Sequence, residues 1–260
     1  MTMGVIDLFA EERRLKIADM IKNTKSITVS ELARTFGVSE STIRRDLQFL
    51  EDQGYIQRTH GGAILQHSHY EPTYLEKESK EAASKKEIGI LSSKLVKDGD
   101  TILLDSGTTT LSIARNLKGK RITVVTNSPV IAMELFTDED IEVILVGGIF
   151  RKETRALVGP IAEKNLKEFK VDKAFIGANG VALDGITTPN IIEATTKRVM
   201  IEISSQPYIV ADHTKFGIST FVRFANLSDI AAIITDRNVD LKWVTSFEEA
   251  GTEIIHPEKG

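Results

Sequence analysis

The strongest constraint on the fold is a series of short, uninterrupted apolar runs in the last two thirds of the chain. They occupy residues 101–105, 122–126, 142–146, 173–176, 208–211 and 230–235, with helical patterns between them. Continuous apolar runs are typical of strands that are buried on both faces, whereas a strand with one solvent-exposed face alternates. The pattern therefore predicts an α/β domain with a largely parallel sheet, spanning residues 87–260.

The loop after the first apolar run is the first candidate ligand site. Residues 105–110 read D-S-G-T-T-T, and a helix is expected over residues 111–117. Ligands of open parallel sheets bind beyond the carboxyl ends of the strands, and hydroxyls with backbone N–H groups at such a turn attract an anion. The spacing of a Walker A loop is absent, and a capped loop that binds nothing would fit S-G-T-T equally well.

Small and polar residues follow the other apolar runs as well. They are residues 126–128, Gly147, Gly148, residues 177–180, Asp212 and Lys215. Lys197 lies early in a helix that is expected over residues 193–205, where an outward-facing lysine would ordinarily be solvated. Glycines allow close backbone approach, amides and carboxylates bond hydroxyls, and a lysine balances a phosphate, so this rim suits a phosphorylated sugar or polyol.

Residues 39–54 predict an amphipathic helix that lies outside the candidate ligand site. Apolar residues recur from Ile43 at i, i+4 and i+7, so one face is buried, and Ser39 and Gly54 are the expected N-cap and C-terminal stop. The outer face carries short hydroxyls and arginines, which suit the phosphates and base edges of a DNA major groove. These residues are Ser41, Thr42, Arg44, Arg45 and Gln48. A solvated amphipathic helix with two surface arginines would explain this stretch alone equally well.

The surrounding residues favour the DNA-binding interpretation. An amphipathic helix is expected over residues 11–23, and a second, short helix over residues 29–36 opens with the capping box T-V-S-E. A turn of three or four residues then leads into the third helix, as in a helix-turn-helix. Residues 55–64 predict two short strands around a Gly-Gly turn, a wing whose Arg58 and His60 could reach the DNA backbone or minor groove.

Net charge supports DNA binding only weakly. Residues 1–65 hold nine Arg/Lys and nine Asp/Glu, a net of zero, and the whole chain has a formal net charge of −4. A DNA-binding surface normally has a basic face. The basic face must therefore arise by segregation, with Arg34, Arg44, Arg45 and Arg58 on one side.

Composition and linkers set the remaining limits. The 260 residues allow two domains, with boundaries expected at 1–66, 67–86 and 87–260, and residues 73–86 are expected to form an exposed, charged helix or connecting segment. The absence of cysteine excludes a disulfide scaffold and a thiolate nucleophile. His67 and His69 have no carboxylate cluster beside them, so neither a metal site nor a cofactor is expected. No apolar run is long enough to cross a membrane, and a cytoplasmic protein is expected.

Two stretches resemble one known family. Residues 12–65, with E-L-A-R-T-F-G-V-S-E-S-T-I-R-R-D-L and R-T-H-G-G-A, resemble the winged helix-turn-helix of the DeoR family of bacterial sugar-metabolism repressors. Residues 85–236 are similar to the effector domain of that family at V-K-D-G-D-T-I, D-S-G-T-T-T, D-K-A-F-I-G-A, E-A-T-T-K and A-D-H-T-K-F-G. The resemblance implies a domain in the ribose-phosphate isomerase and CoA-transferase group of folds.

The resemblance also assigns roles within this sequence. It implies that residues 106–109 hold the phosphate of a sugar, and position 179, often Asp in relatives, is Asn here and loses a carboxylate. The full set of effector-site candidates is Asp105, Ser106, Gly107, Thr108, Thr109, Asn127, Gly148, Asn179, Lys197, Asp212 and Lys215. The full set of DNA-binding candidates is Ser39, Ser41, Thr42, Arg44, Arg45, Gln48, Arg58 and His60.

Three functions remain open at this point. The favoured one is a repressor that binds operator DNA as a homodimer or homotetramer and is released by a phosphorylated sugar. The alternative is a phosphosugar isomerase that carries a DNA-binding module, for which Asp105 and Asp212 are the only carboxylates expected at the rim. A structural or partner-binding protein with a vestigial pocket would show no stabilisation by any sugar phosphate.

Overall fold

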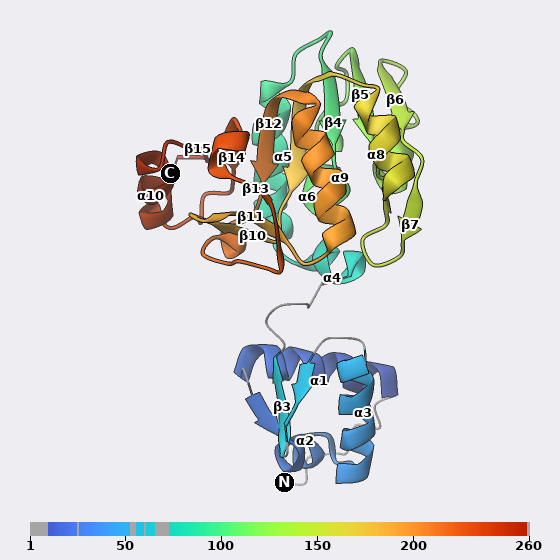
Figure 1. Cartoon of the computed structure of the whole chain (residues 1–260), viewed down its shortest axis with the longest axis vertical. Helices are drawn as coiled ribbons and strands as arrows, with labels where there is room; N and C mark the ends of the chain where they lie inside the picture. Colours follow the sequence, from blue (N-terminus) through green and yellow to red (C-terminus); the bar gives the residue numbers. More distant parts are fainter. Residues whose placement is uncertain (1–9, 25, 53–55, 60, 66–72, 259–260) are drawn as a thin grey trace. The chain divides into compact units, whose positions relative to one another are not determined.

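The computed structural model describes residues 10–24, 26–52, 56–59, 61–65 and 73–258 (Figure 1). The chain divides into two compact units, Met1–Tyr70 and Glu71–Gly260, which are described separately below. Within the described residues, no helix combines the length and the apolar character that a membrane span requires.

The N-terminal unit is a winged helix-turn-helix, as predicted. Its elements are α1 (Ala10–Thr24), β1 (Ser26–Thr28), α2 (Val29–Phe36), α3 (Glu40–Asp52), β2 (Ile56–Arg58) and β3 (Gly62–Leu65). Ile17, Leu32, Ile43 and Leu47 form its core together with other buried apolar side chains. The predicted wing strands β2 and β3 pair antiparallel, and β1, which was not predicted, adds a third strand in the order β1-β3-β2.

Helix α2 agrees with the prediction at both ends because its signals are local. The Thr28 hydroxyl accepts a hydrogen bond from the Glu31 N–H at 3.2 Å, and the Glu31 carboxylate accepts one from the Thr28 N–H at 2.9 Å. Gly37 then adopts a left-handed backbone conformation with φ of 64°, which residues other than glycine rarely adopt. The helix ends there.

The C-terminal unit contains the predicted parallel sheet. Its seven strands lie in the order β15-β14-β12-β9-β4-β5-β6, and every pair of neighbours is parallel. The bounds are β4 (Thr101–Leu104), β5 (Ile122–Thr126), β6 (Ile141–Leu145), β9 (Val171–Gly177), β12 (Ser204–Val210), β14 (Ala232–Ile234) and β15 (Glu253–Ile255). Six of these correspond to the predicted runs, and β15 was missed.

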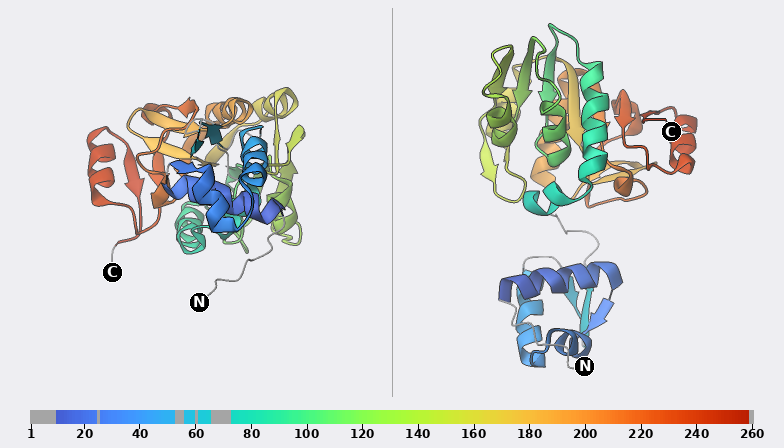
Figure 2. Two further views of the ribbon diagram at one scale, coloured as in Figure 1. Left: turned by 90° about the horizontal axis from the view of Figure 1, so that it is seen from below. Right: turned by 180° about the vertical axis from the view of Figure 1, so that it is seen from behind.

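Helices cover both faces of this sheet. They are α4 (Tyr74–Ser79), α5 (Ala82–Leu95), α6 (Thr108–Ala114), α7 (Pro129–Leu135), α8 (Pro160–Lys167), α9 (Ile191–Glu202) and α10 (Leu241–Glu249). Apolar residues of α8, α9 and α10 pack on one face, and α8 and α9 lie in front of the sheet in Figure 1. Those of α5, α6 and α7 pack on the other face, which is turned to the viewer in the right-hand view of Figure 2. The α/β architecture is therefore confirmed.

Several short strands lie outside the main sheet and were not predicted. β10 (Gly180–Ala182), β11 (Gly185–Thr188) and β13 (Val222–Ala225) form a small antiparallel sheet. β7 (Ile149–Arg151) and β8 (Ala156–Val158) form a hairpin between β6 and α8. Strands of three or four residues are too short for an alternating pattern to stand out from the sequence.

Two expectations about helices are wrong. Helix α6 begins at Thr108 rather than at residue 111, so the three threonines expected in a loop, residues 108–110, belong to the start of this helix. Residues 73–86 are not a uniformly exposed segment, because Tyr74 and Lys85 are buried there. Helix α5 runs across position 86, so the charged stretch is part of a packed helix.

Candidate functional site

The outer face of α3 carries the polar residues that the sequence predicts for DNA contact. Ile43 and Leu47 are buried on the inner face, whereas Arg44 and Arg45 are exposed. The Ser39 hydroxyl accepts a hydrogen bond from the Thr42 N–H at 3.2 Å, which confirms Ser39 as the N-cap. The hydroxyl groups of Ser41 and Thr42 lie 2.8 and 2.9 Å from the same oxygen, so three hydroxyls cluster at the helix start.

An ion-pair cluster that the sequence did not reveal fixes α3 against α1. Asp46 is 1% exposed, and its two carboxylate oxygens lie 2.6 Å from Arg13 Nε and 2.9 Å from Arg14 Nε. The guanidinium of Arg14 also lies 4.2 Å from the ring centroid of Phe49. Arg13 and Arg14 therefore neutralise a buried carboxylate and fix the orientation of α3 against α1. The signal was available, since Asp46 follows Ile43 by three residues and shares its buried face.

The side chains that could contact DNA are partly engaged with each other. Arg44 lies 3.2 Å from Glu40, and both are half exposed, so this pair contributes little and is free to exchange for a phosphate. The guanidinium of Arg58 donates to the Gln48 side-chain oxygen, and its backbone N–H donates to the Glu51 carboxylate at 2.9 Å. Helix α3 and strand β2 of the wing are thereby joined.

Four residues named from the sequence lie outside the described residues. They are Gly54, His60, His67 and His69. Among the residues that the structure does describe, no group of three or more His, Cys, Asp or Glu could hold a metal ion.

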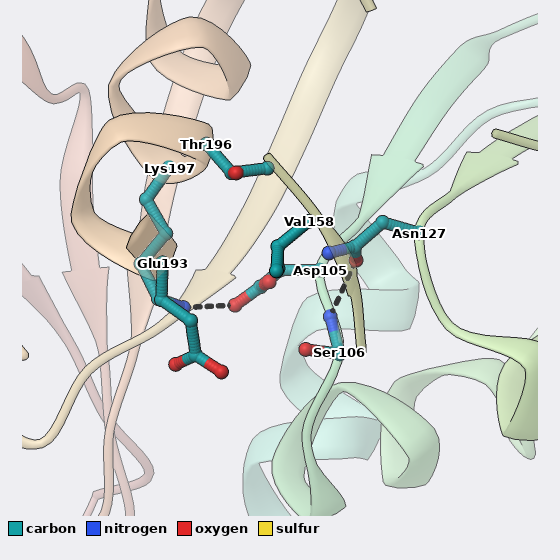
Figure 3. A pocket seen from close by; sticks show the side chains of 7 residues that line it. All are labelled: Asp105, Ser106, Asn127, Val158, Glu193, Thr196 and Lys197. Atoms are coloured by element: carbon teal, nitrogen blue, oxygen red, sulfur yellow. Dashed lines mark hydrogen bonds and ion pairs between the residues drawn. The ribbon is translucent and has the colours of Figure 1, made fainter. Parts of the chain in front are cut away.

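A small pocket lies at the carboxyl ends of β4 and β5. Its lining comprises Asp105, Ser106, Asn127, Val158, Glu193, Thr196 and Lys197 (Figure 3). Residues 105 and 106 follow β4, and Asn127 follows β5. Helix α9 supplies Glu193, Thr196 and Lys197. These side chains leave no room for a water molecule between them, so they must move before a sugar phosphate fits.

The floor of the pocket is a buried ion pair. The Lys197 ammonium donates to the Asp105 carboxylate, and also to the Gly177 carbonyl at 3.0 Å. The Gly177 N–H donates to the same carboxylate at 3.1 Å. Lys197 is only 6% exposed, which excludes the alternative of an ordinary solvated lysine. Complete burial raises the pKa of Asp105 above its ordinary value, and the charge of Lys197 offsets only part of this effect.

Glu193 is a second buried carboxylate in the pocket, and the sequence analysis missed it. It accepts a hydrogen bond from Arg151 Nη1 at 2.7 Å and another from the Thr154 hydroxyl. Burial raises the pKa of Glu193, but the Lys197 ammonium and the Thr154 hydroxyl outweigh burial and hold it below its ordinary value. The expectation that Asp105 and Asp212 are the only carboxylates at the rim is therefore wrong. The i, i+4 spacing within E-A-T-T-K places Glu193 and Lys197 on one helix face and could have revealed the pair.

The loop after β4 is held in place by Asn127. The Ser106 N–H donates to the Asn127 side-chain oxygen at 2.9 Å, and the Asn127 amide donates to the Leu157 carbonyl at 3.1 Å. Asn127 is 1% exposed and therefore positions the loop from within the protein. Thr108 and Thr109 are partly exposed in the first turn of α6, where backbone N–H groups have no acceptor within the helix.

Gly148 and Asn179 do not belong to the pocket lining around Asp105. A Cβ at Gly148 would lie 3.0 Å from both the backbone of Val158 and the Ala162 side chain, so this glycine allows the hairpin to pack closely. The Asn179 side-chain oxygen accepts from the Thr188 hydroxyl at 3.3 Å, and thus has a partner within the protein. Contact of either residue with a ligand stays a prediction.

Asp212 and Lys215 also lie outside this lining. Asp212 accepts from the Thr214 N–H at 3.1 Å, and its carboxylate lies 3.7 Å from the Lys215 ammonium. Lys85 of α5 is close enough to Asp212 for their charges to interact. The buried Lys85 ammonium donates hydrogen bonds to the backbone carbonyls of Lys77 and Lys80 at the C-terminal end of α4. Burial lowers the pKa of Lys85.

Comparison with known proteins agrees with this arrangement. A model of the DeoR-like helix-turn-helix domain matches residues 13–69, and one of the DeoR C terminal sensor domain matches residues 80–237. The HTH-type transcriptional regulator GlpR of Haloferax volcanii is 39% identical over 247 residues, which cover 94% of this chain and 96% of that protein. The lactose phosphotransferase system repressor of Lactococcus lactis is 37% identical over 248 residues, which cover 93% of this chain and 97% of that protein.

Among solved structures, a ribose 5-phosphate isomerase from Methanocaldococcus jannaschii overlaps with 51% of this chain and 53% of its own. Its TM-score of 0.37 and identity of 19% are too low to carry an argument about function. The two matching domain models and the relatives that align over nearly the full length settle the family. The chain belongs to the DeoR family of helix-turn-helix transcriptional regulators.

Proposed function

We propose that this chain represses a carbohydrate-metabolism operon by binding operator DNA, and that a phosphorylated sugar in the pocket of Asp105 and Lys197 releases it. The observation that carries the proposal is the pocket itself, a buried lysine beside a loop rich in hydroxyl groups at the carboxyl end of a parallel sheet. A relative that aligns over nearly its full length is the lactose phosphotransferase system repressor of Lactococcus lactis, which supports a sugar-linked role.

At the DNA, we assign positioning to the hydroxyls and base reading to the arginines. Ser39, Ser41 and Thr42 lie together at the start of α3, where phosphates are bound most readily. Arg44 and Arg45 project from the next turn and can bond guanine bidentately, and Gln48 can bond adenine. Arg58 and His60 of the wing remain predicted backbone or minor-groove contacts.

At the pocket, the phosphate competes with Asp105 for Lys197. Lys197 is buried against one carboxylate, and a phosphate at residues 106–109 would offer its ammonium a second anionic partner. Asp105 and Glu193 can then accept hydrogen bonds from sugar hydroxyls. This exchange of partners supplies the differential binding that a ligand needs in order to shift an equilibrium between two conformations.

The isomerase alternative has one observation in its favour. Glu193 is a buried carboxylate that faces the pocket beside Lys197, and proton transfer at a sugar carbon requires such a base. We nevertheless propose a non-enzymatic role, because Arg151 and Thr154 hydrogen bond to this carboxylate and its lowered pKa makes it a weak base. Isomerase assays with ribose 5-phosphate and hexose phosphates test this, and turnover that Glu193→Gln abolishes would establish an enzyme.

We further propose a homodimer or homotetramer, since helix-turn-helix proteins commonly read two half-sites about one helical turn apart. Light scattering of the protein with and without DNA tests the assembly, and a monomer bound to a single half-site would contradict it.

For the pocket, a thermal-shift panel of phosphorylated sugars is the first experiment. A ligand at 100 times its dissociation constant should stabilise the protein by ~2.7 kcal/mol, and no shift with any sugar phosphate would overturn the proposed function.

A further inference from the structure

A continuous set of contacts leads from the pocket to α4, the first helix after the DNA-binding unit. It begins at Glu193, whose carboxylate accepts from Arg151 at 2.7 Å and from the Thr154 hydroxyl. Arg151 ends β7, and Thr154 lies in the turn between β7 and β8. A change in the hydrogen bonds of the Glu193 carboxylate would therefore act directly on residues 151–155, which we term the hairpin turn.

The hairpin turn also holds the start of α4. The Tyr74 N–H donates to the Glu153 carbonyl at 2.6 Å, and the guanidinium carbon of Arg155 lies 4.7 Å from the centroid of the Tyr74 ring. Tyr74 is 3% exposed and belongs to the core cluster of α5 and α6. One turn of five residues thus contacts both a charged group of the pocket and the helix that continues from the DNA-binding unit.

The backbone around α4 is strained. Among the described residues, Arg155 and Glu81 are the only non-glycine residues with positive φ, at 54° and 51°. Arg155 stacks on Tyr74 at the start of α4, and Glu81 lies between α4 and α5. The Tyr74 hydroxyl is buried without a hydrogen-bond partner in the described part of the chain. Strained residues and unpaired buried groups persist only where surrounding contacts impose them, and they concentrate at switch regions.

Helix α4 is also short. Its six residues cannot form a stable helix by themselves, so its position depends on the contacts at its two ends. If the hairpin turn moves, the N-terminal end of α4 loses the hydrogen bond to Glu153 and the stacking on Arg155. Such an element has the properties of a two-state switch, because a small change at the hairpin turn decides whether its anchoring contacts form.

We propose that the hairpin turn is the coupling element between pocket and DNA-binding unit, with Glu193 as its sensor and Tyr74 as its output. This inference rests on the proposed function of the pocket. A bound sugar phosphate offers oxygen acceptors to Arg151 and hydroxyl donors to Glu193, and so replaces the contacts that hold the hairpin turn. The turn then releases Tyr74, and α4 passes the change to the chain that precedes it.

The test separates binding from coupling with variants outside the pocket. Tyr74→Leu removes the ring on which Arg155 stacks, and Arg155→Asn removes the guanidinium while keeping a residue that tolerates positive φ. Lys152→Ala is the matched control, because Lys152 is exposed on the same hairpin turn. DNA affinity is measured by anisotropy on a duplex that the wild-type protein selects from a random pool. Each measurement is made with and without ribose 5-phosphate, glucose 6-phosphate or fructose 1-phosphate.

We expect wild type and Lys152→Ala to lose DNA affinity on adding an active sugar phosphate, by the ~5- to 150-fold that is typical of coupled sites. Tyr74→Leu and Arg155→Asn should bind duplex and sugar phosphate within about twofold of wild type, yet lose most of this release factor. If both variants are released as strongly as wild type, the coupling role of the hairpin turn is wrong. If no sugar phosphate releases wild type, the proposed function fails, and this inference fails with it.

Hydrogen exchange supplies a readout that needs no DNA. The active sugar phosphate should change exchange in residues 73–79 as well as in residues 105–110 of the wild-type protein. In Arg155→Asn the change in residues 105–110 should persist, while that in residues 73–79 disappears. Equal changes in residues 73–79 of both proteins would contradict the proposal even if Tyr74→Leu failed to fold.

Discussion

The buried pair of Lys197 and Asp105 makes a quantitative prediction about stability. Replacing Lys197 by Met removes the ammonium and leaves a carboxylate that is 2% exposed, with the Gly177 N–H at 3.1 Å as its remaining described donor. Removing one partner of a buried ion pair typically costs about 3–5 kcal/mol, whereas replacing both partners by neutral groups is often close to neutral. We therefore expect Lys197→Met to destabilise the C-terminal unit by about 3–5 kcal/mol, and Asp105→Asn/Lys197→Met to recover most of this loss.

Urea denaturation followed by tryptophan fluorescence measures this effect in the C-terminal unit alone. The chain has a single tryptophan, Trp243, which lies on α10 and packs against the core of that unit. The midpoint should fall for Lys197→Met at an unchanged slope, and it should return toward wild type in the double variant.

The pH dependence gives an independent check on the same pair. Burial raises the pKa of Asp105 in the folded protein, so the folded state binds this proton more tightly than the unfolded state. Stability therefore falls as pH rises through that pKa. Loss of Lys197 should widen the pH interval over which stability falls. The deficit of Lys197→Met should shrink as pH falls. A deficit below about 1 kcal/mol, or a double variant no more stable than the single one, would refute the argument from buried charge.

Three further predictions concern other parts of the chain. Arg45→Ala should weaken operator binding by ~1–3 kcal/mol and relax specificity at one base pair, and unchanged gel shifts would contradict the placement of α3 in the groove. Asp46→Ala should remove the carboxylate that Arg13 and Arg14 share and destabilise α1 by ~1.5–3 kcal/mol for each lost charged hydrogen bond, less for the partly exposed Arg14, which hydrogen exchange of α1 would detect. Tyr74→Phe removes a buried hydroxyl without a described partner, so the melting temperature should stay equal or rise, and a clear fall would reveal a partner for that hydroxyl.

Sequence patterns identified the elements whose signals are local. The capping box at Thr28 and the glycine at position 37 determine α2 without help from the rest of the fold. The continuous apolar runs likewise identified six parallel strands, because strands that are largely buried on both faces have few polar positions. The strands of the small sheet and of the β7–β8 hairpin were missed, since their partners, rather than their own residues, make them strands.

The pocket was predicted only in part because strand order is not encoded locally. Residues after β4 and β5 meet, since these strands are neighbours, and Ser106 contacts Asn127 as a result. Asp212 follows β12, which β9 separates from β4 in the sheet, so it does not reach the lining around Asp105. The i, i+4 spacing pairs Glu193 with Lys197 on one face of α9, but whether this face meets the pocket depends on the order of the strands.

In the DNA-binding unit, the positions of the charged side chains say more about the basic face than their number does. Arg13 and Arg14 enter the count as free positive charges, but both are engaged by the buried Asp46. Arg44 and Arg45 are exposed on α3, as the helical pattern predicted. The basic face therefore depends on fewer residues than the sequence contains, and DNA affinity should depend strongly on salt.

Under the proposed function, sugar phosphate and operator DNA favour opposite conformations of one protein. The most direct measurement is a calorimetric titration of the free protein and of its duplex complex with the active sugar phosphate at one salt concentration. Reciprocity requires DNA to weaken sugar phosphate binding by the same factor by which the sugar phosphate weakens DNA binding. Equal factors, clearly greater than one, are the predicted result, whereas equal affinity of the sugar phosphate for the free and DNA-bound protein would contradict the account.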